Sequence, residues 1–417
     1  MVRLLIIADD FTGALDTGIQ FKKRGICTQV FTKQMLEAED INPETEVLVV
    51  DTETRPAAKE TAYEVVSSIA RWALVRGIEI IFKKTDSALR GNIGAELQAV
   101  ADVGGALYLL PGYPEIDRIT KDGIHYISGE LLENSVFGND PFEPVKKSYI
   151  PDIIGEQSDI SVTCVKNDEP IPECSGKKTE IVVCDTVKNY DIETRLDELV
   201  GKKRLKLIAG CAALGDCLVD KLSFHSRNEA QFRRTEGMYV ACGSLNRITQ
   251  KQVEYAETNC GFERKHLTME QKLVPGYYET PEGKQFLDEI VELCRTKKKV
   301  VVDTFDVDGD KSGFLKDHGI PDGQVRELIA AAHGRIVNEI VSRREDVTVL
   351  MTGGDTLMGY MKQIGCTEIE PLCEIEQGVV VSSIECGGHR QQVISKSGGF
   401  GTEDILCRIA KKVINKH

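Results

Sequence analysis

The chain has 417 residues, enough for two or three domains of about 150 residues each. Hydrophobic residues make up 41% and charged residues 28%, which excludes a disordered chain. The 66 acidic against 52 basic residues give a net charge of −14, and this field repels phosphate backbones and anionic lipids. We therefore expect no nucleic-acid and no membrane partner.

Targeting segments and cysteine motifs are missing from the sequence. It has no run of 18 apolar residues. The apolar part of segment 1–13 is too short for a secretory signal, and the segment is too acidic for one. None of the 13 cysteines forms a C-x-x-C motif, and Cys27, Cys184, Cys242 and Cys407 adjoin apolar segments. We therefore expect a cytoplasmic protein with reduced, buried thiols and no zinc or disulfide framework.

Short apolar runs rich in β-branched residues recur along the chain, each followed by a helix-like segment. This alternation predicts parallel strands buried on both faces. The clearest runs are Leu4–Ala8, Val47–Val50, Ile78–Phe82, Leu107–Leu110, Ile181–Cys184, Leu205–Ala209, Met238–Cys242, Val300–Val302 and Val347–Met351. The polar segment 222–237 predicts a junction between two α/β domains, residues 1–230 and 231–417, with largely parallel sheets and an interdomain cleft.

Polar residues follow the first strands of this pattern, where open α/β sheets bind their ligands. Asp9 and Asp10 follow the first strand, 51–55 (DTETR) the second and 83–92 (KKTDSALRGN) the third. An arginine there could clamp a carboxylate, and the aspartates could accept hydrogen bonds from hydroxyls. A polyhydroxylated anion would fit this edge, although either aspartate could instead cap a helix and the third segment could be a solvated loop.

Three glycine-containing turns mark the second half of the chain, at 241–244, 352–356 and 396–401. Each lies beside a predicted strand or before a helix-like segment. Glycines at such turns let the backbone approach phosphate oxygens, with free amides facing the anion. The turns therefore indicate a nucleotide site, although paired glycines are also common in ordinary turns.

Standard motifs of several other enzyme classes are absent from the sequence. It contains no P-loop, no G-x-G-x-x-G after a strand, no G-x-S-x-G and no H-E-x-x-H. Segment 210–215 (GCAALG) has the outer glycines of a dinucleotide turn but lacks the middle one. A hydrolase with a nucleophile elbow and a dinucleotide-dependent enzyme are therefore both disfavoured.

Longer strings extend nearly from end to end of the chain. They are ADDFTGALD (8–16), DTETR (51–55), KKTDSALRGNIGAEL (83–97), PGYPEIDRITKDGIHYISGELL (111–132), DPFEPVKKSYIPDII (140–154), GS…T…Q (243–252), GGDT (353–356) and KSGGFG (396–401). In this order they resemble the four-carbon acid sugar kinase family. The resemblance implies ATP-dependent phosphorylation of threonate, erythronate or 3-oxo-tetronate by an N-terminal acid-sugar domain and a C-terminal nucleotide domain.

The resemblance also implies roles for single residues. The nucleotide-binding set is Ser244, Gly353, Gly354, Asp355, Thr356, Lys396, Gly398 and Gly399. The substrate-binding set is Asp9, Asp10, Arg55, Lys83, Asp86, Ser87, Arg90 and Asn92. The chain departs from the family pattern at 245–247, where relatives often carry serine, cysteine or proline, and at 85–88, where TDSA replaces the common IDST. The second departure could alter which diastereomer fits.

The implied mechanism is in-line transfer of the γ-phosphoryl of ATP to a hydroxyl of the sugar acid, and we favour the terminal one. Mg²⁺ would bridge the phosphates, with protein ligands that the sequence does not identify. The catalytic base could be Asp355, at a helix start beside glycine amides, or Asp86 or Asp10 from the substrate side. Domain closure would exclude water from the reaction.

Two other functions compete with the kinase as interpretations of the sequence. A dehydrogenase of the same sugar acids lacks support because the dinucleotide motif is missing. A sensor that binds acid and nucleotide without turnover would be favoured by inert residues at Asp86, Asp355 and the glycine turns, yet all are present. The sequence does not distinguish the acids or their stereoisomers, and a homodimer is a common arrangement for such enzymes.

Overall fold

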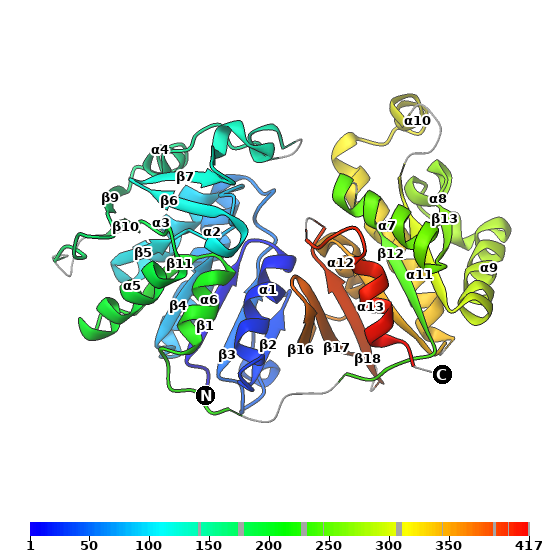
Figure 1. Ribbon diagram of the computed structural model, residues 1–417, viewed down its shortest axis with the longest axis horizontal. Helices are drawn as coiled ribbons and strands as arrows, with labels where there is room; N and C mark the ends of the chain where they lie inside the picture. The colour runs from blue at the N-terminus through cyan, green and yellow to red at the C-terminus, as the bar shows by residue number, and fades with distance from the viewer. Residues whose placement is uncertain are drawn as a thin grey trace. The chain divides into compact units, whose positions relative to one another are not determined.

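The computed structural model describes residues 1–140, 143–173, 179–226, 232–244, 246–305, 311–343, 345–386, 389–398 and 400–415. These residues form two compact units, Met1–Glu229 and Ala230–His417 (Figure 1). Each unit is an α/β structure with a largely parallel sheet, as the sequence predicts. No helix in the described part of the chain is long and apolar enough to cross a membrane.

The N-terminal unit is built on a parallel sheet with the strand order β2-β3-β1-β4-β11-β5-β10-β9. Its strands are β1 (Leu4–Ala8), β2 (Thr28–Phe31), β3 (Val47–Asp51), β4 (Ile80–Lys84), β5 (Ala106–Leu110), β9 (Ser161–Val165), β10 (Glu180–Cys184) and β11 (Leu207–Gly210). Its helices are α1 (Phe11–Lys22), α2 (Lys59–Val75), α3 (Ile93–Gly104), α4 (Ile150–Gly155), α5 (Asn189–Gly201) and α6 (Ala212–Val219). A small antiparallel sheet consists of β6 (Arg118–Lys121), β7 (Ile124–Ile127) and β8 (Glu130–Leu131).

Strand β4 ends two residues later than the apolar run predicts. Lys83 and Lys84 belong to the strand, because β4 pairs with β1 and β11 up to the register Ala8–Lys84 and Gly210–Lys84. The ladder of hydrogen bonds continues through these two polar residues and overrides the end of the apolar pattern. The two lysine side chains therefore point to opposite faces of the sheet.

The connections that leave β1 and its two neighbouring strands run in opposite directions across this sheet. The connection from β1 through α1 leads towards β2, whereas those from β3 through α2 and from β4 through α3 lead the other way. Right-handed crossovers then place α1 and α2 on opposite faces. Accordingly α1 packs with α6, and α2 packs with α3 (Figure 1). The carboxyl end of β1 is thus a topological switch point, the usual place for a ligand.

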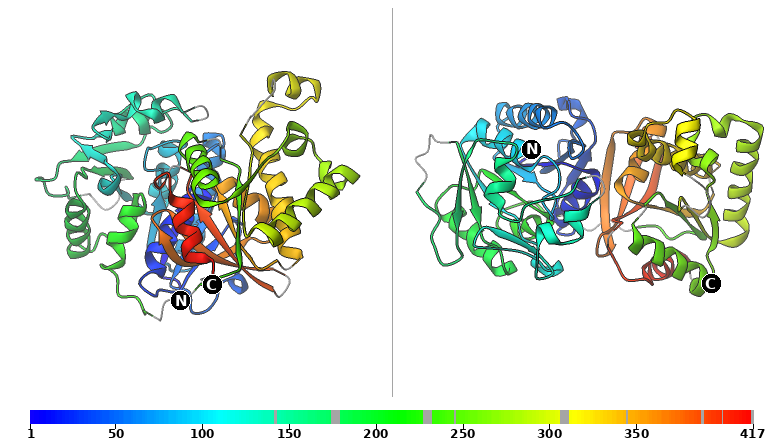
Figure 2. Two further views of the ribbon diagram at one scale, coloured as in Figure 1. Left: turned by 45° about the vertical axis from the view of Figure 1, so that its right-hand side comes forward. Right: turned by 90° about the horizontal axis from the view of Figure 1, so that it is seen from above.

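The C-terminal unit has the strand order β13-β14-β12-β15-β18-β17-β16, in which β17 is antiparallel to both of its neighbours. Its strands are β12 (Gly237–Cys242), β13 (Glu263–His266), β14 (Lys299–Asp303), β15 (Val347–Thr352), β16 (Glu368–Glu376), β17 (Val379–Cys386) and β18 (His389–Lys396). Its helices are α7 (Arg247–Cys260), α8 (Met269–Leu273), α9 (Pro281–Lys297), α10 (Lys311–Asp317), α11 (Val325–Ser342), α12 (Gly354–Ile364) and α13 (Ile405–Val413). Helix α7 packs with α13, and α11 packs with α12, α8 and α9 (Figure 2).

The register of the parallel strands aligns the turns of the C-terminal unit. Cys242, the last residue of β12, pairs with Asp303 of β14 and with Thr352 of β15, and Thr352 pairs with Lys396 of β18. The segments that follow these strands therefore emerge at one edge of the sheet. All three glycine-containing turns of the sequence lie on that edge.

The cysteines depart in part from the prediction of reduced thiols. Cys407 of α13 forms a disulfide with Cys260, the last residue of α7, and their Cα atoms are 5.9 Å apart. Their separation of 147 residues kept this pair outside any spacing motif. Cys27, Cys184 and Cys242 are free, as expected, and burial raises the pKa of the Cys184 thiol to about 12.

Candidate functional site

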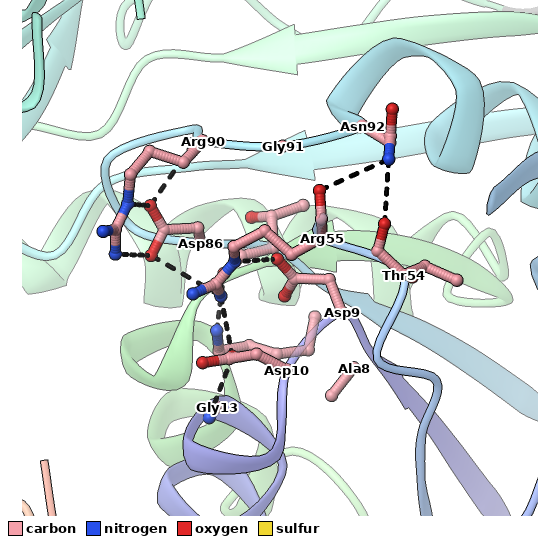
Figure 3. A network of polar contacts seen from close by, with 12 residues as sticks. Ala8, Asp9, Asp10, Gly13, Thr54, Arg55, Asp86, Arg90, Gly91 and Asn92 are labelled. Atoms are coloured by element: carbon pink, nitrogen blue, oxygen red, sulfur yellow. Dashed lines mark hydrogen bonds and ion pairs between the residues drawn. The ribbon is translucent and has the colours of Figure 1, made fainter. Parts of the chain in front are cut away.

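Arg55 lies at the centre of a buried ion-pair cluster at the carboxyl edge of the N-terminal sheet (Figure 3). Its Nε donates to Asp9 Oδ2 at 2.7 Å, and its Nη2 lies 2.7 Å from Asp10 Oδ1 and 3.7 Å from Asp86 Oδ1. Burial lowers the pKa of the Arg55 guanidinium, but the three carboxylates raise it well above its ordinary value. Arg55 is therefore a fixed cation that joins the loops after β1, β3 and β4.

Asp86 is held by a forked arginine contact. Its Oδ2 accepts a hydrogen bond from Arg90 Nε at 2.8 Å, and its Oδ1 accepts one from Arg90 Nη2 at 3.1 Å (Figure 3). The backbone amides of Ala88 and Arg90 also donate to Oδ2, at 3.2 and 3.3 Å. Burial raises the pKa of Asp86, but the charges of Arg90, Arg55 and Arg118 lower it well below the ordinary value. A carboxylate so stabilised is a weak proton acceptor.

Both arginines that the sequence offered as carboxylate clamps are engaged by acids of the chain itself. Arg90 uses Nε and Nη2 on Asp86, and its Nη1 lies 3.1 Å from Asp140 Oδ2. Arg55 holds three aspartates, as described above. These arginines shape the edge through contacts with acids of the chain itself.

Asp10 combines the two roles that the sequence left open. It is the N-cap residue of α1, and its Oδ1 accepts the backbone amide of Gly13 at 3.0 Å. A Cβ on Gly13 would lie 2.5 Å from Asp10 Oδ1 and 2.8 Å from Lys84 Nζ, so only glycine fits there. The side chain of Asp10 is 26% exposed, and its Oδ2 accepts no hydrogen bond from any residue that the structure describes. Asp10 thus presents one open carboxylate oxygen.

Asp9 lies beneath this surface and is almost completely buried. Burial raises the pKa of its carboxyl group, but the charges of Arg55, Lys83 and Lys84 more than compensate, and the pKa lies below its ordinary value. Its Oδ1 has no hydrogen-bond partner among the described residues. Asp9 therefore remains an anion that orients Arg55.

Two members of the predicted substrate-binding set are turned inward. The Lys83 ammonium is fully buried and lies 2.9 Å from Glu96 Oε2, on the α3 side of β4. Asn92 Nδ2 donates to the carbonyls of Thr54 and Ala57, both at 2.8 Å. Lys83 thus anchors α3 to the sheet, and Asn92 ties the loop after β4 to the loop that carries Arg55. Both residues support the edge from within.

Two cations that the sequence pattern did not single out lie at the same edge. Lys84, on the face of β4 opposite to Lys83, donates from Nζ to the carbonyl of Thr85 at 2.6 Å. Arg118 donates from Nη1 to Ser87 Oγ, and its guanidinium lies 4.9 Å from the centre of the Phe137 ring. The end of β4 and the alternation of its side chains would have singled out Lys84. Arg118 gave no such signal, because it follows β5 only after a turn.

The GGDT turn forms an uncapped helix start in the C-terminal unit. Gly353 has φ 86° and ψ 144°, a conformation reserved for glycine, and its amide donates to the carbonyl of Lys396 at 2.9 Å. Helix α12 begins at Gly354, and within the described residues no side chain caps its first amides. These amides can meet an anion. Asp355 in the first turn accepts Arg326 Nε at 2.6 Å.

Helix α7 holds the KSGGFG turn in place. Thr249 Oγ1 donates to the carbonyl of Gly398 at 2.8 Å, and Gln252 Nε2 donates to that of Gly401 at 2.9 Å. A Cβ on Gly398 would lie 2.9 Å from Ser244 Oγ, so the two turns approach each other closely. The structure therefore brings Ser244 and Gly398 together, as the sequence implied.

Lys396 supplies the positive charge of this edge. It is the last residue of β18, is almost completely buried, and donates from Nζ to the carbonyl of Ser397 at 2.9 Å. Burial lowers the pKa of its ammonium to about 8. Thr356 points inward and donates to the carbonyl of Thr352 at 2.8 Å, so it supports α12 from within. Gly399, which the sequence assigned to the nucleotide, lies outside the described residues.

Two family models match the chain in succession. One, described as a sugar-binding N-terminal domain, matches residues 4–218, which is more than half of the chain. The other, described as a nucleotide-binding C-terminal domain, matches residues 239–406.

Full-length relatives carry kinase names. A D-threonate kinase from Salmonella typhimurium is 25% identical over 427 residues, 97% of each chain. A D-erythronate kinase from Heliobacterium modesticaldum is 24% identical over 439 residues, 100% of this chain and 98% of the relative. A 3-oxo-tetronate kinase from Methylobacterium radiotolerans is 25% identical over 425 residues, 96% of this chain and 97% of the relative.

The chain belongs to the four-carbon acid sugar kinase family. Solved structures share its fold. A Salmonella typhimurium LT2 protein superposes with a TM-score of 0.77 at 18% identity, covering 99% of this chain and 100% of that chain. Haemophilus influenzae protein HI1011 superposes with a TM-score of 0.71 at 20% identity, covering 99% and 100%. In this four-carbon acid sugar kinase, the Arg55 cluster falls in the sugar-binding match, and the GGDT and KSGGFG turns fall in the nucleotide-binding match.

Proposed function

We propose that the protein transfers the γ-phosphoryl group of ATP to the terminal hydroxyl of a four-carbon sugar acid of the threonate, erythronate or 3-oxo-tetronate class. One observation carries this proposal. A single chain combines a charged, hydrogen-bonding strand edge in its sugar-binding domain with glycine turns, a free helix start and a buried lysine in its nucleotide-binding domain. The kinase names of the full-length relatives support the same reaction.

ATP is the proposed nucleotide, bound by its phosphates at the start of α12. The first amides of this helix, the turn at Ser244 and the ammonium of Lys396 offer donors and charge of the required sign. Among the described residues, no group of three or more histidine, cysteine, aspartate or glutamate side chains is placed to hold a metal. Mg²⁺ would arrive together with ATP. When bound, Mg²⁺ would neutralise part of the phosphate charge.

Asp10 is the proposed base. Its Oδ2 is open, whereas Asp86 is stabilised as an anion by Arg90 and two amides, and Asp355 is paired with Arg326. The substrate hydroxyl oxygen forms a bond to the γ-phosphorus while the bond from that phosphorus to the β,γ-bridging oxygen breaks. ADP leaves with the electron pair, and the hydroxyl proton passes to Asp10. Arg55, 2.7 Å from Asp10 Oδ1, fixes the carboxylate for this transfer.

Nucleotide affinity is expected to depend on the charge of Lys396. Its pKa of about 8 means that the ammonium is protonated below that pH and loses its proton above it. The terminal phosphate of ATP ionises near pH 6 and is fully charged throughout. We expect the dissociation constant of ATP to rise about tenfold between pH 7.5 and 9.5. Calorimetric titrations across this range measure it.

The Lys396→Arg variant is the matched control for that titration, because a guanidinium stays charged throughout. Its affinity should be independent of pH over the same range. An equal loss in the wild type and in Lys396→Arg would show that another group controls nucleotide binding. The pH dependence would then give no support to Lys396 as a phosphate ligand.

The test of the function itself is a coupled assay of ADP release. Mg-ATP is supplied with D- and L-threonate, D- and L-erythronate and the 3-oxo-tetronates, each against a blank without acid. Turnover of one acid well above the blank, with one phosphate transferred per ADP, is the expected result. ADP release at the blank rate with every acid would refute the proposed reaction.

A further inference from the structure

Lys84 is a buried cation without a carboxylate partner. Its residue is only 5% exposed, and its ammonium makes one hydrogen bond, to the Thr85 carbonyl at 2.6 Å. Among the described residues it forms no ion pair, whereas its neighbour Lys83 is paired with Glu96 at 2.9 Å. The charge of Lys84 acts on Asp9 without a direct contact, and burying a charge that lacks a direct partner is unfavourable, so a counter-ion from outside the chain is expected here.

Arg118 is a second cation at this edge that forms no ion pair with any described residue. Its one hydrogen bond goes from Nη1 to Ser87 Oγ, and the guanidinium rests on the Phe137 ring, 4.9 Å from its centre. No acid in the described part of the chain pairs with it. Burial lowers the pKa of Arg118, while Asp86 raises it, and the side chain remains a cation at neutral pH. The remaining donors of its fork make no hydrogen bond to any residue that the structure describes.

The two cations border one region of the sheet edge. The Cys211 thiol lies there and donates to the carbonyl of Gly112 at 3.2 Å. Arg118 joins the same turn, because its carbonyl accepts a hydrogen bond at 2.6 Å from the amide of Tyr113, the residue after Gly112. Burial raises the pKa of Cys211, and the charges of Lys84 and Arg118 both lower it. The register continues this alignment, because Lys84 of β4 is opposite Gly210, the residue before Cys211.

We infer that Lys84 and Arg118 form the subsite that binds the carboxylate of the sugar acid. This inference rests on the proposed function. The two other arginines at this edge already have ion-pair partners, since Arg55 contacts three aspartates and Arg90 contacts two. The carboxylate is the charged group common to the whole substrate class, and it would give each cation the direct ion pair that neither has among the described residues.

The subsite also orients the substrate relative to Asp10. A Cβ on Gly13 would lie 2.8 Å from Lys84 Nζ and 2.5 Å from Asp10 Oδ1, so the ammonium is close to the proposed base. Asp10 repels a carboxylate and accepts a hydrogen bond from a hydroxyl. The carboxylate therefore lies towards Lys84 and Arg118, and a hydroxyl lies towards Asp10. Discrimination between acids and neutral analogues then depends on Lys84 and Arg118.

The test compares each acid that the enzyme uses with its neutral carboxamide. Lys84→Met and Arg118→Met remove one charge each, and Lys59→Met removes one from the exposed start of α2 as the matched control. In each subsite variant we expect kcat/KM for the acid to fall about 100-fold and that for the amide to change less than about threefold. The control should keep the wild-type ratio of acid to amide.

Several outcomes would overturn the inference. An equal loss for acid and amide would assign the cations to the transferred phosphoryl group or to the fold, and no loss for either would exclude them from the site. Fluorescence of Trp72, the single tryptophan, monitors folding of the N-terminal unit. If Lys84→Met does not fold, the ratio of kcat/KM for acid and amide in Arg118→Met tests the inference. Arg118→Lys should restore part of the preference for the acid.

Failure of the proposed kinase reaction can be distinguished from failure of the carboxylate subsite. A wild-type protein that turns over none of the acids refutes the kinase reaction. Direct calorimetric binding of the same acids then tests the subsite by itself. Binding that is weakened at least about tenfold by Lys84→Met and Arg118→Met, but not by Lys59→Met, supports the subsite. Binding equal in all four proteins, or binding to none of them, overturns it.

Discussion

Replacement of Asp10 by asparagine should lower kcat by about 10²–10⁴-fold, the usual contribution of a general base. Asparagine caps a helix as well as aspartate does, so the hydrogen bond from the Gly13 amide and the start of α1 are retained. Arg55 keeps Asp9 at 2.7 Å and Asp86 at 3.7 Å. The loss of kcat therefore reports on the open carboxylate oxygen, because the helix cap and the other contacts of Arg55 are kept.

Steady-state kinetics with the preferred acid measure this effect, and two further variants sharpen it. Asp10→Ala should lose as much kcat and also about 1 kcal/mol of stability, because it removes the cap. Asp355→Asn tests the rival base in the nucleotide-binding domain. A kcat of Asp10→Asn within tenfold of the wild type, together with a large loss in Asp355→Asn, would transfer the role to Asp355.

Asp86→Asn should destabilise the N-terminal unit by about 3 kcal/mol, the lower end of the range for breaking a buried ion pair. The variant removes the charge that Arg90 grips with two hydrogen bonds, at 2.8 and 3.1 Å. Arg90 retains Asp140, and Arg55 retains two aspartates, which keeps the loss at that lower end. Since whole domains are stable by about 5–15 kcal/mol, the change is large.

Urea unfolding followed by Trp72 fluorescence measures this loss, because the one tryptophan lies in α2 of the N-terminal unit. The effect has a defined pH dependence. The pKa of Asp86 is lower in the folded state, so its contribution is complete above the unfolded pKa of about 3.9 and is lost as the pH falls through the folded pKa. The difference between the proteins should be full at pH 6 and shrink below about pH 4. An unchanged transition at pH 6 would disprove the structural role of Asp86.

The sequence alone determined the fold class, the family and the segments that carry the candidate site. Three apolar runs are each followed by a polar segment, DD, DTETR or KKTDSALRGN. This order places Asp10, Arg55 and Asp86 after strands, and the structure brings the three residues to one edge. These features are local, because a strand and the turn after it are encoded by neighbouring residues. The same is true of the GGDT turn, whose Gly353 has a positive φ.

Only the tertiary structure decided which of these residues are open to a ligand. Pairing of β4 with β1 and β11 extends the strand through Lys83 and Lys84, and the alternation of a strand then buries one lysine against Glu96 and directs the other to the edge. Arg118 reaches that edge through a turn after β5, and Cys260 meets Cys407 across 147 residues. Contacts between distant segments set burial and pairing, and spacing along the chain does not encode them.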